Sequence, residues 1–239
     1  MSRLTRRRFF PIILFIVSLV AAFFAIRMLY GEPQIDRSIL SGTPCAIPCW
    51  QGITPGVTTY GDALKVLQGN AYVKQGSVEQ AGGAASGGAT WEWTIPSQRV
   101  LPRLTWSDGI VQEITLGLPF ELRAQEMIDR FGQPEGLIAS PGGQPEAWYW
   151  IIDLYYPQLG AEFKAYTAEF ANTLGPATEI DVAVLFQKIP LKDRISQEFV
   201  KADVIEHRVS LLRTWAGFGD LFEIYYQDQN ELFIPTKPR

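Results

Sequence analysis

The residue types that most often carry catalysis are sparse in this chain. Its single histidine, His207, stands between Glu206 and Arg208, and catalytic Ser-His-Asp and Cys-His arrangements both depend on an imidazole. Because its neighbours are charged, we expect His207 to be a solvated surface residue. The sequence contains no nucleophile-elbow, phosphate-cradling or dinucleotide-binding glycine motif. We therefore predict no catalytic, cofactor-binding or metal-binding residue.

Paired carboxylates are the remaining route to hydrolysis, since a glycosidase needs two acids that flank a sugar. Glu146 or Asp153 could pair with Glu162 or Glu169, which lie in neighbouring predicted strands. An acidic chain offers such pairs by chance. We expect that the protein is not an enzyme, with an envelope hydrolase of unrecognised type as an alternative.

Tryptophan is the strongest candidate for a functional residue type. Alternation along a strand puts Trp91 and Trp93 on one side, and likewise Trp148 and Trp150, while Trp106 lies on a partner strand. One interpretation is that all five pack in the core against helices. The other is an exposed aromatic sheet face that binds a protein or a glycan, because tryptophan is enriched at binding hot spots.

The two cysteines, Cys45 and Cys49, are four positions apart in a Pro-Cys-Ala-Ile-Pro-Cys-Trp segment. An even number of cysteines in an exported chain favours a disulfide, and two free thiols are the alternative. A zinc site would need two more ligands than the sequence readily supplies. We expect a structural disulfide that locks a linker, residues 31–51, against the first helix of the body and buries Trp50.

The N-terminus combines basic residues with a long apolar run. Eighteen uncharged residues, 9–26, are followed by Arg27 and a further apolar stretch to Tyr30, which is enough for one helix to cross a bilayer. Four arginines precede the run: Arg3, Arg6, Arg7 and Arg8. The positive-inside rule then predicts a cytoplasmic tail (1–8), a transmembrane signal-anchor in the lipid bilayer (9–30) and an extracytoplasmic body. A cleaved signal peptide is the alternative.

The body is acidic. Five of the chain's 21 basic residues precede residue 32, so the rest carries 16 basic and 25 acidic residues, a net charge of about −9. Nucleic-acid binding needs a basic footprint, so we expect no nucleic-acid partner.

Hydrophobic patterns in the body predict a tandem repeat of one helix followed by antiparallel strands. Helical residues 62–67 and 126–131 correspond at a constant offset of 64 positions, each after a turn-rich entry. Strands are predicted at 91–95, 101–106, 110–116, 147–156, 161–170, 179–187 and 221–226, with a loop at 81–89 and an ambiguous segment at 190–215. The fold class is α+β, with repeats at 52–117 and 118–239, the second carrying a C-terminal extension.

The segments that lead into and out of the predicted helices resemble a known family. The Gly-Ile-Thr-Pro-Gly-Val-Thr-Thr entry at 52–59 and the Phe-Gly-Gln-Pro-Glu ending at 131–135 resemble the modules of β-lactamase inhibitor protein and of SmpA/OmlA-type envelope lipoproteins. The segment 48–56 also resembles membrane-anchored proteins of Chloroflexi-like bacteria. The resemblance implies a non-enzymatic module that contacts other proteins through a sheet face. This chain departs from the family in its predicted membrane span and in the sequence after residue 187.

These expectations combine into one functional hypothesis. We expect a single-pass cell-membrane protein whose extracytoplasmic body binds or scaffolds another envelope protein. A ligand-sensing or glycan-binding ectodomain is the alternative.

Overall fold

The computed structural model describes residues 15–22, 35–95, 100–144, 147–168, 171–198 and 201–224. The chain divides into two compact units, Met1–Gln34 and Ile35–Arg239. In the first unit, residues 15–22 are helical and exposed, and the remainder of the predicted span 9–30 lies outside the described residues. No helix within the described ranges is long and apolar enough to cross a membrane.

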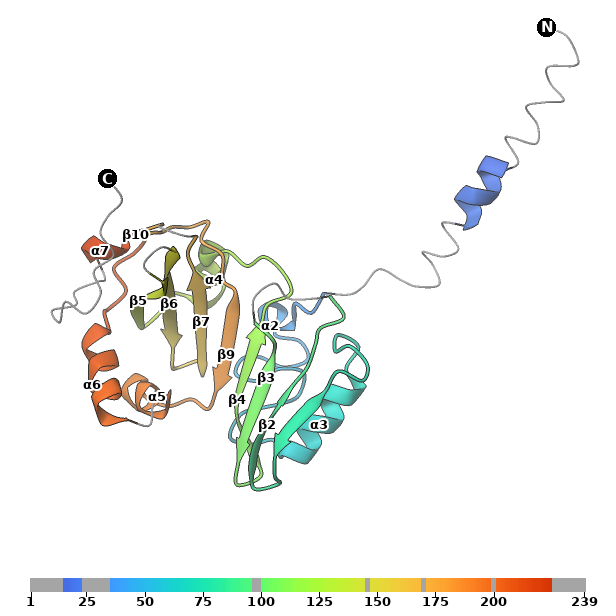
Figure 1. Ribbon diagram of the computed structural model, residues 1–239, viewed down its shortest axis with the longest axis horizontal. Coiled ribbons are helices and arrows are strands. Elements are labelled where there is room, and N and C mark those ends of the chain that lie inside the picture. Colours follow the sequence, from blue (N-terminus) through green and yellow to red (C-terminus); the bar gives the residue numbers. More distant parts are fainter. Residues whose placement is uncertain are drawn as a thin grey trace, which may run out of the picture. The chain divides into compact units, whose positions relative to one another are not determined.

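The second unit is built on an eight-stranded sheet with antiparallel pairing throughout and the order β1-β2-β3-β4-β9-β7-β6-β5 (Figure 1). Its strands are β1 (Glu79–Gly82), β2 (Ser86–Thr90), β3 (Arg103–Ser107), β4 (Ile110–Gly117), β5 (Gly136–Gln144), β6 (Ala147–Tyr156), β7 (Ala161–Tyr166) and β9 (Val182–Phe186). The α+β class with antiparallel sheet is confirmed. β8 (Thr173–Leu174) and β10 (Gly219–Asp220) form a separate two-stranded sheet.

The sheet repeats one arrangement twice. In the first half, α3 (Tyr60–Gly69) precedes the strands that end in β4; in the second half, α4 (Ala124–Phe131) precedes the strands that end in β9. The first residues of the two helices are 64 positions apart, the offset that the sequence predicts. The two halves meet where β4 pairs with β9, with Thr115 opposite Val184. The predicted repeats therefore share one continuous sheet.

Local signals explain why α3 begins where it does. The side chain of Thr59 accepts a hydrogen bond from the backbone N–H of Asp62 and donates one to its carboxylate, so Thr59 is the N-cap residue of α3. Ala63, Leu64 and Leu67 form the buried stripe of this helix. α3 and α4 share a core with alternate residues of the strands, so both helices pack on one side, here named the first face.

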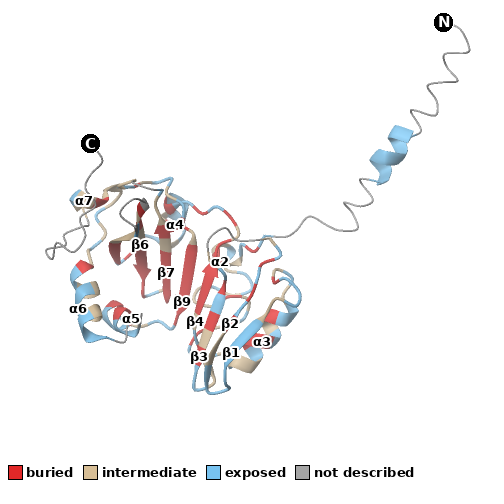
Figure 2. Ribbon diagram, in the orientation of Figure 1, coloured by how far each residue is buried: buried red, intermediate tan, exposed pale blue. Residues whose placement is uncertain are grey.

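The opposite side, the second face, is covered in part by the C-terminal extension. Helices α5 (Leu191–Glu198) and α6 (Ala202–Leu211) resolve the ambiguous segment 190–215 as mostly helical. Ile195 and Leu211 from these helices pack with Ile138 and Tyr155, which point away from the first face. The central strands are therefore buried on both faces, whereas β1 is exposed (Figure 2).

The predicted disulfide between Cys45 and Cys49 is present. It follows the short helix α2 (Ser38–Ser41) and immediately precedes Trp50, which is buried. The Trp50 indole N–H donates to Asp36 at 2.7 Å. A buried indole N–H needs an acceptor, so the disulfide and this hydrogen bond together fix the start of the body on its core.

The strand predicted at 91–95 is wrong, and so is the loop predicted at 81–89. Residues 91–95 make one isolated bridge, between Trp93 and Val73, while β1 and β2 form a hairpin in the glycine-rich segment. A Cβ on Gly87 would clash with the Ala81 carbonyl oxygen and lie 2.5 Å from Trp106 Cζ2. Gly87 is thus needed because the Trp106 indole crosses β2 at this position, a tertiary contact that β-propensity does not register.

Two further segments differ from what the sequence predicts. The segment 221–226, predicted as a strand, begins with the helical turn α7 (Leu221–Ile224), because the Asp220 side chain accepts hydrogen bonds from the N–H groups of Phe222 and Glu223. β5 was not predicted, since Pro141 and its neighbouring glycines signal a turn. β5 lies at the edge of the sheet, where a missing backbone donor is tolerated.

Candidate functional site

The five tryptophans predicted as a binding face lie in the interior. Trp91, Trp93, Trp106, Trp148 and Trp150 are 1, 4, 4, 2 and 0% exposed. They belong to the core under the first face, where Trp91 stacks on Trp50 at 5.5 Å and Trp150 meets Phe222 edge-on at 4.9 Å. The helices and loops that cover this face bury the rings, so the exposed aromatic face is not present and the core interpretation applies.

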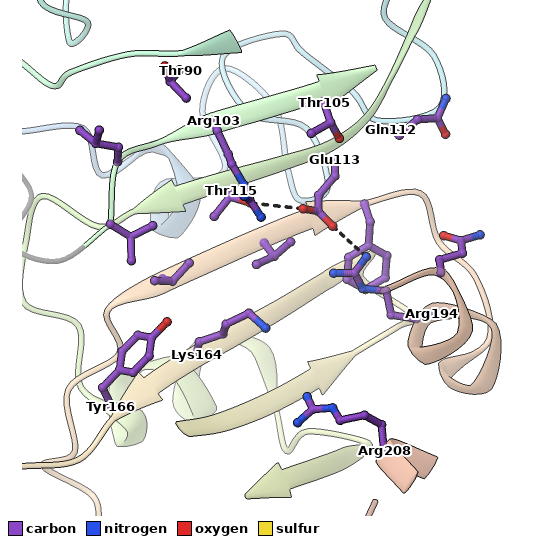
Figure 3. Close-up of a pocket in the computed structure, with 16 residues that line it drawn as sticks. Thr90, Arg103, Thr105, Gln112, Glu113, Thr115, Lys164, Tyr166, Arg194 and Arg208 are labelled. Atoms are coloured by element: carbon purple, nitrogen blue, oxygen red, sulfur yellow. Dashed lines mark hydrogen bonds and ion pairs between the residues drawn. The ribbon is translucent and has the colours of Figure 1, made fainter. Parts of the chain in front are cut away.

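The second face carries a cavity of about 880 Å³. Its floor comes from β3, β4, β9 and β7, and one wall comes from α5 and α6 (Figure 3). Alternation along these strands sends one set of side chains to the core and the other set to the cavity: in β7, Phe163 and Ala165 enter the core, while Lys164 and Tyr166 line the cavity.

Five charged residues line the cavity: Arg103, Glu113, Lys164, Arg194 and Arg208. Four of them are cations and one is an anion. Lys164, Arg194 and Arg208 are paired with the carboxylates of Glu113, Asp153 and Glu162, so Arg103 supplies the excess positive charge of the cavity in a body whose net charge is about −9. An excess cation in a cleft attracts ligands of the opposite sign, so the cavity is suited to recognise a negative group.

Arg194 joins the α5 helix to the floor of the cavity. Its guanidinium donates to Glu113 at 2.9 Å and to Glu162 at 3.0 Å, and it lies over the Phe186 ring at 4.3 Å from the centroid. Arg194 is 4% exposed and Glu162 is fully buried. Buried charges persist only when they are paired and hydrogen-bonded, so these contacts hold the guanidinium in one orientation.

A second cluster of ion pairs continues the network toward α6. Lys164 pairs with Glu162 and, at 3.0 Å, with Asp153. Arg208 reaches Asp153 from α6 at 2.5 Å. Together, six residues form one ion network: Glu113, Asp153, Glu162, Lys164, Arg194 and Arg208. It ties both helices of the extension to three strands of the sheet.

The candidate catalytic residues fall into three places. Asp153 and Glu162 come together on neighbouring strands, as the sequence suggested, but both are buried within the ion network and neither lines the cavity. Glu146 and Glu169 lie outside the described residues. His207 is exposed on α6. Among the described residues, no group of three or more His, Cys, Asp or Glu side chains could hold a metal ion.

Arg103 differs from the other cations of the cavity. It is exposed on β3, between Thr90 on β2 and Thr115 on β4. Its Nε donates a long hydrogen bond to Thr115 at 3.4 Å. Within the part of the chain that the structure describes, no carboxylate lies within ion-pair distance of Arg103, so its terminal amino groups are available to a ligand.

Apolar side chains and one phenol complete the lining. Val182, Val184 and Leu101 contribute the apolar part, and Leu101 is 61% exposed. Burial is the main effect that raises the pKa of Tyr166, so this phenol stays neutral at physiological pH and can donate a hydrogen bond.

The cations were not identified from the sequence, because the residues that they contact are distant along the chain. Arg194 and Glu113 are 81 positions apart, and Arg208 and Asp153 are 55 apart. One local signal was present. In β7, Ala-Glu-Phe-Lys-Ala-Tyr, charged residues alternate with core residues, which indicates a strand buried on one face and polar on the other.

Comparison of the chain with protein-family models, with curated proteins and with solved structures found no match.

Proposed function

We propose that this chain is a membrane-anchored extracytoplasmic protein of the cell envelope that binds another envelope protein without catalysing a reaction. The observation that carries the proposal is the cavity on the second face, where exposed Arg103 stands unpaired by a carboxylate among the described residues. A charged cavity on a sheet is suited to recognition, since its side chains are already oriented and little ordering is needed when a partner binds.

Three features support binding over catalysis. The carboxylates nearest the cavity are held in ion pairs with Arg and Lys, the histidine is exposed on α6, and the cavity presents cations in place of an acid–base pair. The resemblance of segments 52–59 and 131–135 to envelope modules that contact proteins through a sheet supports the same function. The disulfide supports an oxidising compartment outside the cytoplasm.

A ligand-sensing module is the second candidate, and the volume of the cavity favours it. Small-molecule sites commonly occupy about 300–1,000 Å³, and 880 Å³ falls in this range. Such sites are lined mainly by apolar groups, whereas charged and polar side chains make up most of this lining. We therefore place protein recognition first.

Site-specific photocrosslinking in native cells tests the proposal. A benzophenone amino acid at Thr105, in the cavity, should give one discrete protein adduct. The same amino acid at Lys65, exposed on α3, is the matched control and should not give that adduct. The absence of a protein adduct at Thr105, or identical adducts from both positions, would refute protein binding at the cavity.

The proposed location has its own test. Protease added to spheroplasts should degrade the body, and a reporter that is active only in the cytoplasm should be inactive when fused to the C-terminus. A protected body together with an active reporter would contradict the extracytoplasmic location.

A further inference from the structure

The two halves of the sheet differ in what covers their second face. In the second half, α5 and α6 lie on this face, and Arg194 and Arg208 reach down to carboxylates on the strands. In the first half, Thr90 and Arg103 on the same face are exposed. The charge also differs: Asp153 and Glu162 in the second half, and Glu113 on β4 at the junction, present carboxylates to the arginines of the helices. The remainder of the first half, here called the bare half, presents Arg103.

We propose that the bare half of the second face binds an acidic peptide segment of the partner protein, with a carboxylate of that segment on the Arg103 guanidinium. This inference depends on the proposed function and identifies the chemistry of the partner. Arginine matches a carboxylate because its planar fork can donate two parallel hydrogen bonds to the two oxygens. The single long bond from Nε to Thr115 leaves the terminal amino groups for this contact.

The surroundings of Arg103 fit an extended peptide. Thr90 and Thr105 supply hydroxyl groups on neighbouring strands at the same face, and hydroxyls can hydrogen-bond to peptide N–H and C=O groups. Leu101, 61% exposed, lies two positions from Arg103 and also lines the cavity. The site therefore combines one cation with one apolar contact, which fits an acidic residue next to an aliphatic one.

Aromatic geometry favours a peptide over an acidic polysaccharide. Sugar rings bind well against open aromatic rings, but the five tryptophans discussed above are buried. The aromatic residues of the lining are Tyr166 and Phe186. Phe186 is covered by the Arg194 guanidinium, and Tyr166 packs against Tyr149 with ring centroids 6.0 Å apart. The described lining thus offers a sugar at most the Tyr166 ring, which already packs edge-on with Tyr149.

Peptide binding to the detergent-solubilised full chain tests the inference. The probe is a fluorescent peptide of alternating Glu and Leu, and its matched control has Gln in place of Glu. We expect the acidic peptide to bind, the Gln peptide to bind at least about tenfold more weakly, and high salt to weaken binding of the acidic peptide, as for partly exposed ion pairs.

Two arginine variants with the same change in net charge make the test specific. Arg103→Gln should weaken binding of the acidic peptide about tenfold or more, since a charge-assisted hydrogen bond to the carboxylate is lost. Arg123→Gln, an exposed arginine paired with Glu121 just before α4, should change the affinity less than about twofold.

Each of the other outcomes overturns the inference. These outcomes are failure of the acidic peptide to bind, equal losses in both arginine variants, or tighter binding of oligogalacturonate than of the peptide. A discrete adduct from Thr105 together with no peptide binding would contradict only the acidic-peptide inference. Loss of the adduct as well would contradict the proposed function itself.

Discussion

Arg194 Nη1 lies 2.9 Å from Glu113 Oε2 and joins two residues that are 81 positions apart in the sequence. The contact connects the C-terminal extension to the last strand of the first half. The same guanidinium also pairs with Glu162 in the second half. One side chain thus bridges the extension and both halves of the sheet.

Replacing Arg194 should therefore destabilise the fold. Arg194→Met leaves the fully buried Glu162 carboxylate with Lys164 but without the guanidinium, and removal of one partner from a buried ion pair typically costs about 3 kcal/mol or more. We expect a loss of this size in the free energy of unfolding, measured by chemical denaturation. The double variant Arg194→Met, Glu162→Gln should recover part of the loss, because the buried charge is removed as well.

The control for this prediction is an exposed ion pair. Arg123→Met breaks the pair with Glu121, in which both side chains are about 60% exposed, and it should change the free energy of unfolding by less than about 1 kcal/mol. Equal effects of Arg194→Met and Arg123→Met would show that the ion network does not stabilise the fold.

Gly87 should not tolerate a larger residue. A Cβ at this position would meet the Ala81 carbonyl oxygen and the Trp106 ring, and overpacking typically costs about 1–3 kcal/mol. We expect Gly87→Ala to lower the free energy of unfolding by about this amount. Gly83→Ala is the control, because nothing lies within 4 Å of a Cβ there, and its effect should stay within about 0.5 kcal/mol. Similar values for both variants would contradict the close packing of Trp106 on β2.

Removal of the disulfide should destabilise the body modestly. Cys45 and Cys49 close a loop with a sequence separation of 4, for which the chain-entropy relation gives about 2 kcal/mol. For a domain of this size, that corresponds to a fall in Tm of roughly 4–8 °C. The measurement is thermal unfolding of the Cys45→Ser, Cys49→Ser variant beside the oxidised protein. If a reductant lowers the Tm of this cysteine-free variant as well, the effect does not come from the disulfide.

Two tyrosines should lose their phenol protons at a higher pH than an exposed tyrosine does. Burial raises the pKa of Tyr156 and is the main effect that raises the pKa of Tyr166, so the folded protein retains protons that the unfolded chain releases near pH 10. Their contribution to stability is thus present below about pH 10 and is lost as the pH rises through the folded-state pKa values. In a pH titration followed by the ultraviolet absorbance of tyrosinate, part of the rise in absorbance should occur at pH values well above about 10. The Tyr156→Phe variant should reduce that part. Identical titration of the folded and guanidinium-unfolded chain would contradict this prediction.

The elements that the sequence predicts well are those with local causes. The hairpin at 107–109 forms because Asp108 and Gly109 both adopt positive φ, 53° and 72°, which suits an Asp-Gly turn between strands. β6 has the predicted bounds, 147–156, since most of its residues are aromatic or aliphatic strand formers. The N-cap at Thr59 has an equally local cause.

The elements that the sequence does not predict depend on contacts between residues that are distant along the chain. The β1–β2 hairpin needs glycine at position 87 because the Ala81 carbonyl oxygen and the Trp106 ring occupy the space of a Cβ, and this reason is visible only in three dimensions. The candidate site is still harder to predict from the sequence, since its cations come from four separate elements, β3, β7, α5 and α6. The alternating charges of β7 indicate a polar face, but they do not indicate which arginines reach it.

The β4–β9 pairing has a consequence for how the body can be divided. Hydrogen bonds between these strands run through the middle of the sheet, so cutting the chain at 117 would expose the unpaired edge of β4. Exposed strand edges promote aggregation. The two halves of the sheet should consequently unfold together as one cooperative unit, and neither half should be soluble when expressed alone.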